Sequence, residues 1–124
     1  MIFVLINIFI WLYYQIYNKR RYFYMDDRAQ SIIDAKAKVL KALGHPTRLF
    51  IVEELARGER CVCELVKLVG ADFSTVSKHL TLLKNAGVVQ DDKRGQMVYY
   101  TLKVPCILRF MDCIEAVIVS GSCK

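Results

Sequence analysis

Two cysteines separated by a single residue, Cys61 and Cys63, are the residues of this sequence best suited to chemistry. Thiolates are soft ligands that select soft metal ions. The pair comes just before an apolar stretch with helical spacing, and a helix N-terminus lowers the pKa of a nearby thiol. The pattern therefore predicts a site for a thiophilic ion. The alternative interpretation is that both cysteines are small buried apolar residues.

The spacing of the pair sets a geometric condition for such a site. Side chains at positions i and i+2 point to nearly opposite sides of a regular helix or strand. The backbone between Cys61 and Cys63 must therefore leave regular geometry if both sulfurs bind one ion. Two thiolates seldom complete a site, so Cys106 and Cys113 are candidates for further metal ligands.

The uses of Cys106 and Cys113 stay open at this point. They are seven residues apart and so lie on one side of a predicted helix. Three interpretations are open. The two cysteines complete the first site, within one chain or across a dimer; they form a second site with Cys123; or they pack in the core of a dimer.

The composition favours a reduced, cytoplasmic protein that meets a polyanion. Five cysteines is an odd count, without the dense spacing of a secreted disulfide framework. The 124 residues fit one domain, and the formal net charge is +6. Lys19, Arg20 and Arg21 carry three of these charges, so the rest of the chain is only mildly basic. Nucleic-acid binding must therefore be argued from motifs.

The apolar spacing predicts four helices before any strand. They cover residues 29–43, 46–57, 63–69 and 73–86. Gly70 and Ala71 form a tight turn between the last two, and Asp72 is a suitable N-cap for the helix that follows. A short helix, a turn with glycine and a second capped helix is the helix-turn-helix pattern.

A β-hairpin and a final helix follow. Residues 88–90 and 97–102 are β-rich runs, with a charged tip at 91–95, which is the shape of a wing. The last helix, 105–119, has an apolar face wide enough for a subunit interface. The predicted fold is mostly α with a small β-hairpin: a winged helix-turn-helix in the order α-α-α-α-β-β-α, dimeric through its terminal helix.

The first 24 residues form a separate segment, and residues 25–124 form the predicted DNA-binding domain. Residues 1–17 are almost wholly apolar and are followed by a basic cluster, opposite to the order in a secretory signal. One interpretation is a start codon assigned too early, with Met25 as the true start. The others are a membrane anchor and a helix that binds a partner.

The predicted DNA-reading surface combines the fourth helix with the wing. The N-terminal part of a recognition helix reads base edges in the major groove, and wing residues contact phosphate or the minor groove. The alternative is an ordinary solvated helix face. The candidate residues are Ser74, Thr75, Ser77, Lys78, His79, Lys93, Arg94 and Gln96.

Three stretches carry a family resemblance: LGHPTRL at 43–49, CVCEL at 61–65 and STVSKHLTLLKNAGVV at 74–89. The chain resembles the ArsR/SmtB family of metal-responsive repressors. That resemblance implies a symmetric homodimer whose metal-free form binds double-stranded operator DNA and releases it when metal binds. Related arsenite repressors often carry a third cysteine at the position of Val66, and this chain does not.

The donor set suggests which ion acts as inducer. The predicted last helix has no histidine, so a nitrogen and oxygen zinc site is not expected there. All-sulfur donors favour arsenic(III) or antimony(III), followed by cadmium(II) or lead(II).

A competing function is a thiol switch that responds to oxidant or persulfide, with Cys61 or Cys63 bridged to Cys106 or Cys113. The sequence has no C-x-x-C motif, nucleophile–histidine pair or phosphate-binding glycine loop, so no catalytic residues are predicted.

Overall fold

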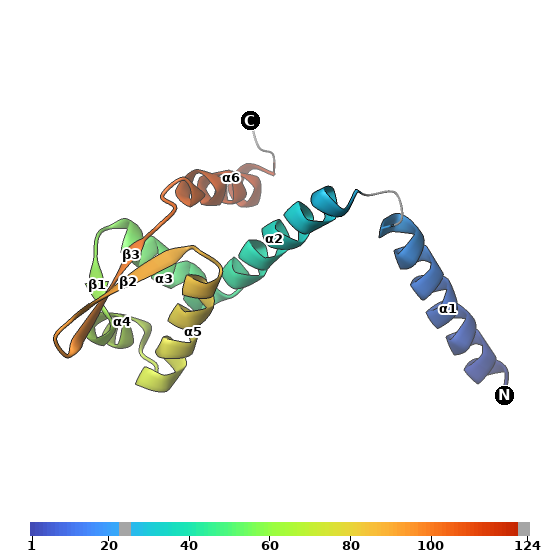
Figure 1. Cartoon of the computed structure of the whole chain (residues 1–124), viewed down its shortest axis with the longest axis horizontal. Coiled ribbons are helices and arrows are strands. Elements are labelled where there is room, and N and C mark those ends of the chain that lie inside the picture. Colours follow the sequence, from blue (N-terminus) through green and yellow to red (C-terminus); the bar gives the residue numbers. More distant parts are fainter. Residues whose placement is uncertain (23–25, 122–124) are drawn as a thin grey trace. The chain divides into compact units, whose positions relative to one another are not determined.

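The computed structural model describes residues 1–22 and 26–121, which form six helices and three short strands (Figure 1). Two units divide the chain, Met1–Ala37 and Lys38–Lys124. The elements are α1 (Ile2–Tyr22), α2 (Asp27–Leu43), α3 (Pro46–Ala56), β1 (Arg60–Cys61), α4 (Val62–Val69), α5 (Phe73–Asn85), β2 (Val89–Arg94), β3 (Met97–Leu102) and α6 (Ile107–Ser120). From α2 onward this is the predicted winged helix-turn-helix order, with β1 added.

The core of the second unit lies between α3, α4, α5 and the hairpin. Each of these elements contributes side chains with almost no exposed surface, so the two helices of the helix-turn-helix are held against a common interior. The largest fully buried side chains are Ile51, Val52, Leu65, Val76, Leu80, Leu83, Val88 and Val89.

The turn between α4 and α5 follows from local sequence. Gly70 ends α4 with φ +71°, a left-handed conformation that glycine adopts without strain. Asp72 then caps α5, because its carboxylate accepts from the backbone N–H of Thr75 at 3.1 Å and from the Thr75 hydroxyl at 2.6 Å. These hydrogen bonds lower the pKa of Asp72. The predicted start of the recognition helix is confirmed.

A two-residue strand, β1, was not expected from the sequence. It pairs antiparallel with β3, with Arg60 opposite Tyr100 and Cys61 opposite Tyr99, and β3 also pairs with β2. Two residues are too few to show an alternation of polar and apolar side chains, so only the pairing with β3 reveals the strand. The strand places Cys61 in register with the wing.

The wing differs from its prediction in the length of its first strand. The charged residues expected at the tip belong to β2, which continues to Arg94, and the turn is only Gly95 and Gln96. Gly95 has φ +63°, as the first position of a two-residue type II′ hairpin turn requires. Because β2 is an edge strand with exposed side chains after Val89, it accommodates consecutive charges.

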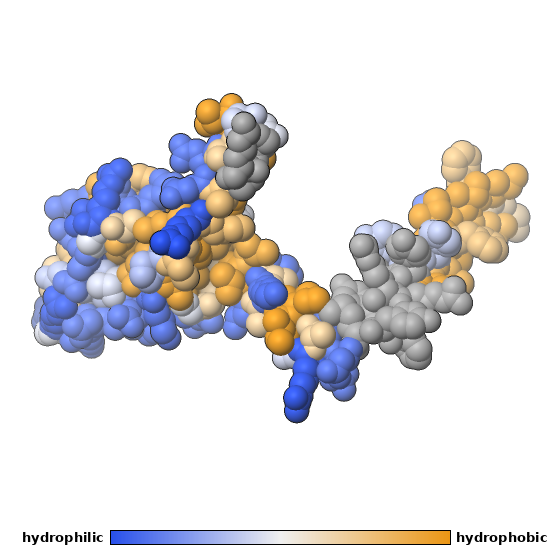
Figure 2. Space-filling view, turned by 90° about the horizontal axis from the view of Figure 1, so that it is seen from above, coloured by the Kyte–Doolittle hydropathy of each residue, from blue (hydrophilic) through white to orange (hydrophobic). Residues whose placement is uncertain are grey.

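Residues 1–16, most of which belong to α1, are all exposed and are apolar except for Asn7 and Gln15. Apolar side chains cover most of the face of this segment that Figure 2 shows. None of the helices described within residues 1–22 and 26–121 has the length and hydropathy that a membrane span requires. The three interpretations given above for residues 1–24 stay predictions.

Candidate thiol site and DNA-binding surface

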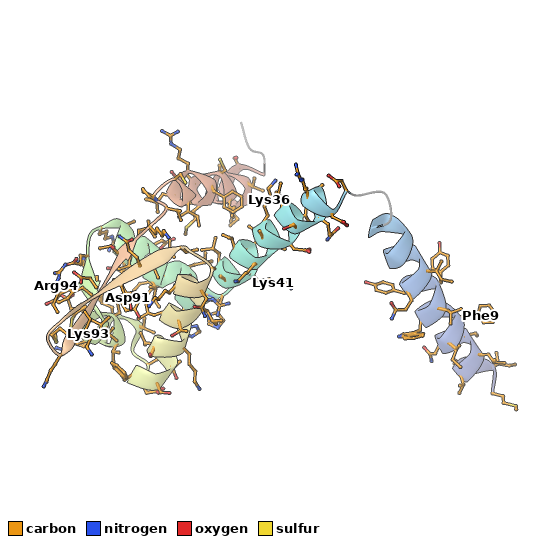
Figure 3. The ribbon with its side chains drawn as sticks, in the orientation of Figure 1. Phe9, Lys36, Lys41, Asp91, Lys93 and Arg94 are labelled. Atoms are coloured by element: carbon orange, nitrogen blue, oxygen red, sulfur yellow. A yellow bond between two sulfur atoms is a disulfide. The ribbon has the colours of Figure 1, made fainter. Side chains whose placement is uncertain are left out.

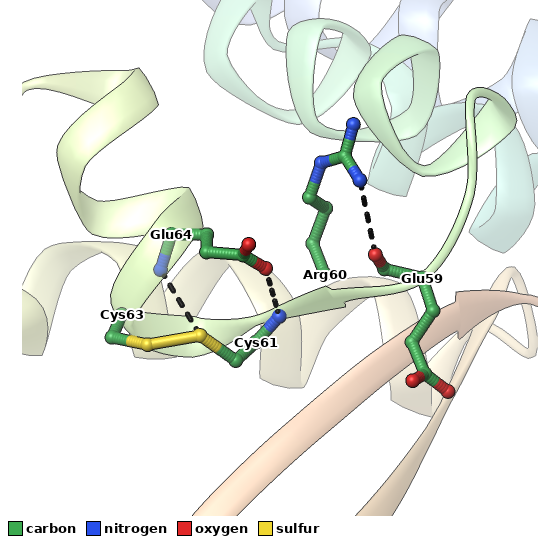
Figure 4. The surroundings of a disulfide bond; sticks show 5 residues. All are labelled: Glu59, Arg60, Cys61, Cys63 and Glu64. Atoms are coloured by element: carbon green, nitrogen blue, oxygen red, sulfur yellow. Dashed lines mark hydrogen bonds between the residues drawn. A yellow bond between two sulfur atoms is a disulfide. The ribbon is translucent and has the colours of Figure 1, made fainter.

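Cys61 and Cys63 lie where β1 becomes α4, and a disulfide joins them (Figure 4). Cys61 has an extended backbone, φ −76° and ψ 158°, and Cys63 belongs to the first turn of the helix. This change of backbone conformation brings the two sulfurs together, as the predicted departure from regular geometry requires. The expectation of reduced thiols differs from the structure, because their Cα atoms are 5.3 Å apart and the sulfurs are bonded.

The Cys61 sulfur also caps α4. The backbone N–H of Glu64 donates to Cys61 Sγ at 3.3 Å, and the Glu64 carboxylate accepts from the Cys61 N–H at 2.8 Å (Figure 4). This is a capping box with sulfur in place of the usual hydroxyl. Cys61 is only 4% exposed, whereas Cys63 is exposed. Chemistry at this sulfur pair therefore acts on the first turn of the helix-turn-helix.

Cys106 and Cys113 do not complete this site within one chain. Both are exposed and neither belongs to the disulfide. In the part of the chain that the structure describes, no three His, Cys, Asp or Glu side chains are grouped so that they could hold a metal ion. In α6, Ile107 packs into the core, whereas residues 112–120, Cys113 among them, are exposed. Cys123 lies outside the described residues.

The predicted base-reading residues occupy the first two turns of α5 and differ in exposure. Ser74 and Lys78 are exposed, whereas Thr75 and Ser77 are half-buried. The hydroxyl of Thr75 is already bonded to Asp72, as described above. Ser74 and Lys78 are therefore the side chains of this group that are most available to a nucleic acid.

His79 has a structural setting that the sequence did not reveal. Its ring lies 4.6 Å from the ring of His45, centroid to centroid, and its Nδ1 is 3.4 Å from an Arg48 terminal nitrogen. The same guanidinium donates to the carbonyl oxygens of Lys41 and Ala42 at the end of α2. His79 was expected to be an isolated DNA contact, but it also joins α5 to α3.

This setting predicts a pH-dependent stability. Burial, followed by the charges of His45 and Arg48, lowers the pKa of His79. The folded state thus binds fewer protons than the unfolded state. The contribution of His79 to the free energy of unfolding is therefore fully present above the ordinary histidine pKa, and it is lost as the pH falls from there toward the lower pKa of the folded state. We expect the free energy of unfolding in urea to fall between pH 7.5 and 5.5, and to fall less in His79→Gln. An identical fall in both proteins would show that His79 is not the responsible group.

At the wing, Lys93, Arg94 and Gln96 are all exposed, but Arg94 also binds carboxylates of the protein. Figure 3 labels Lys93 and Arg94 on the hairpin. The guanidinium of Arg94 donates to both carboxylate oxygens of Glu59, at 2.7 and 2.8 Å, and to Asp92 at 2.9 Å. These carboxylates, Glu59 first, raise the pKa of Arg94. Sequence reasoning missed Glu59, because 35 residues separate it from Arg94 and no periodic pattern links them.

The helix-turn-helix, the wing and the polar start of α5 define a DNA-binding transcriptional regulator. The family model for bacterial regulatory proteins of the arsR family matches residues 45–91. The chain belongs to this family, whose members are transcriptional regulators and not enzymes.

Two relatives show what the family includes. A cadmium resistance transcriptional regulatory protein, a CadC homolog from Staphylococcus aureus, is 45% identical over 67 residues, which are 53% of this chain and 55% of that protein. The uncharacterized helix-turn-helix transcriptional regulator MJ1325 of Methanocaldococcus jannaschii is 38% identical over 80 residues, which are 61% of this chain and 90% of that protein. The chain thus spans about half the length of the CadC homolog and nearly all of MJ1325.

A solved structure shares the fold. The homodimeric winged helix-turn-helix DNA-binding domain of Mb0332 from Mycobacterium bovis has a TM-score of 0.71 and 28% identity. The match covers 82% of this chain and 97% of that one. The predicted fold class is confirmed.

Proposed function

We propose that this protein is a dimeric repressor that binds operator DNA and releases it when a thiophilic ion binds Cys61 and Cys63. The observation that carries the proposal is the position of the two sulfurs. They lie together at the first turn of α4, which packs against the recognition helix α5. A ligand that redirects this turn changes how α5 meets the major groove.

The DNA-binding part of the proposal rests on the exposed polar start of α5 and on the wing tip. Ser74 and Lys78 face solvent at the end of α5 that enters a groove in proteins of this fold. Lys93 and Gln96 extend from the hairpin tip. The side of the molecule with the wing is largely hydrophilic in Figure 2, as contact with phosphates requires.

Loss of one phosphate contact should be visible in the salt dependence. We expect Lys78→Ala to weaken operator binding and to reduce the slope of log K against log salt by about 0.9, because one fewer counterion is released. Lys103→Ala, at the opposite end of the hairpin from its turn, is the matched control and should keep the wild-type slope. Anisotropy titrations at several salt concentrations measure both. Equal slopes in all three proteins would remove Lys78 from the interface.

The dimer rests on the apolar face of α6. Four large apolar side chains of this face are between 44% and 78% exposed: Phe110, Ile114, Val117 and Ile118. Leaving so much apolar surface in water is unfavourable for one helix of a small domain. The Mb0332 domain is itself a homodimer. A second copy of this chain, with its own α6, is the proposed cover for these side chains.

The proposed inducer is a soft ion, because the donors are sulfur. After reduction, Cys61 and Cys63 supply two thiolates that need little movement to share one ion. Cadmium(II) is supported by the cadmium resistance protein among the relatives. Arsenic(III) and antimony(III) suit a site with few ligands, whereas cadmium(II) and lead(II) would need further donors. Cys106 or Cys113 of a second subunit are the candidate additional ligands.

One titration tests the function. A duplex is selected from a random pool by the reduced protein, and its affinity is measured with arsenite, antimonite, cadmium, lead or zinc. We expect at least one thiophilic ion to weaken binding about tenfold, within the usual range of allosteric coupling. Failure to select any duplex, or equal affinity with and without every ion, would refute the proposal.

A second candidate function is a redox response, and the disulfide itself favours it. Two thiols and one hydrogen peroxide give a disulfide and two waters, so the pair could report oxidant in place of metal. The predicted bridge to Cys106 or Cys113 is replaced here by a bridge within the pair. Operator release by peroxide, but not by ions under strict reduction, would favour this function.

A further inference from the structure

The first strand of the wing is attached by ion pairs on both of its faces. On one face, Lys84 Nζ at the end of α5 donates to Asp91 at 2.9 Å. On the other, Asp92 accepts from Arg94, which also binds Glu59 through both terminal nitrogens. Neighbouring strand residues point to opposite faces, so the two attachments are independent. The wing is therefore connected to the recognition helix and to the segment that carries the thiols.

Three contacts meet at Arg94. Besides the two carboxylates, its guanidinium lies over the ring of Tyr99, 4.5 Å from the centroid. Tyr99 is the residue that β3 places opposite Cys61. Glu59 is two residues before Cys61, and its carboxylate extends away from the disulfide (Figure 4). Arg94 thus contacts both a near neighbour of Cys61 along the chain and its partner across the sheet.

We propose that the Glu59–Arg94 pair is the positioning contact that transmits the state of Cys61 and Cys63 to the wing. Strand β1 has only two residues, so few backbone hydrogen bonds resist its movement. A change at Cys61 displaces Glu59, and the two parallel hydrogen bonds to Arg94 are sensitive to such a displacement. The inference rests on the proposed function, because it explains how ligand binding at the thiols alters the DNA-binding surface.

The partial exposure of the pair makes it suitable for mutation. The side chains of Arg94 and Glu59 are 50% and 34% exposed, and ion pairs of this kind contribute little to folding stability. Glu59→Gln, Arg94→Gln and the double variant should therefore fold. Lys93→Gln removes a neighbouring wing charge outside the pair and is the matched control.

The first test uses reduced protein, cadmium chloride and the duplex selected by the wild type. We expect cadmium to lower wild-type affinity about tenfold. The three pair variants should lose most of this effect, and the double variant should be no worse than either single one. Lys93→Gln should weaken DNA binding equally with and without cadmium.

A separate measurement follows the affinity for cadmium itself. Cadmium affinity, measured by competition with a chromophoric chelator, should stay at the wild-type value in Glu59→Gln. A pair variant that keeps the wild-type effect, or that loses cadmium affinity, would overturn the proposal.

A second test needs neither DNA nor metal. Amide hydrogen exchange of residues 89–102 is compared in the reduced protein and in protein oxidised at Cys61 and Cys63 with a thiol-specific oxidant. We expect the hairpin to exchange differently in the two wild-type states and identically in Glu59→Gln, with the disulfide formed in both proteins. This result would support the transmitting role even if no ion releases DNA. No difference in the wild type would refute it.

Discussion

The protein with Cys61→Ser and Cys63→Ser should bind its operator with the same affinity in the presence and absence of the inducing ion. Serine hydroxyls are hard donors and do not replace thiolates for a soft ion. The wild-type response, expected to be about tenfold, should fall to none. Anisotropy titration of the selected duplex under reducing conditions measures both proteins.

Serine is chosen because it separates ligand loss from helix damage. The Cys61 sulfur accepts from the Glu64 N–H, and a serine hydroxyl is a preferred acceptor at this N-cap position. Alanine at position 61 would remove the acceptor and cost about 1 kcal/mol. Metal-free operator affinity should therefore be kept in the serine variant.

Cys106→Ser tests whether the C-terminal part of the chain contributes to the metal response. Cys106 is exposed on the turn before α6 and outside the disulfide. If it supplies a ligand from a second subunit, the ion response weakens but persists, because two thiolates remain. If the ion weakened operator binding fully in the Cys61 and Cys63 variant but not in Cys106→Ser, the metal site would have to lie at the C-terminal helix instead.

Leu80→Ala should lower the free energy of unfolding by about 2–5 kcal/mol, the range for removing a buried leucine side chain. Leu80 has no exposed surface and joins α5 to the core formed with α3, α4 and the hairpin. The cost is large because tight packing of these elements limits how far they can close around the cavity. Urea unfolding at a fixed protein concentration measures it, since a dimer's stability depends on concentration.

Leu82→Ala is the control on the same helix. Leu82 is 50% exposed, and we expect a change of about 0.5 kcal/mol or less, as for other surface positions. Comparable losses in the two variants would mean that Leu82 is covered in the assembled protein. The two leucines are two residues apart, so the contrast reports packing and not helix propensity.

The local features of this molecule were predictable from its sequence. Helices α2, α4, α5 and α6 show a periodic apolar face, and the caps at Gly70 and Asp72 act within four residues. The pairing of Cys61 with Cys63 is also local, since one backbone change between them determines where both sulfurs point. The fold class therefore required no knowledge of distant contacts, whereas the disulfide within the pair was not predicted, and the proposed metal ligands stay a prediction.

The surroundings of each site depended on tertiary structure. The two-residue strand β1 exists only because β3, nearly forty positions later, lies beside it. Arg94 binds Glu59, and His79 meets His45, because packing brings separate elements together. A single charge or imidazole has no period along the chain, and side chains reach only a few ångströms. Which distant groups they meet is therefore determined by how the helices and strands pack.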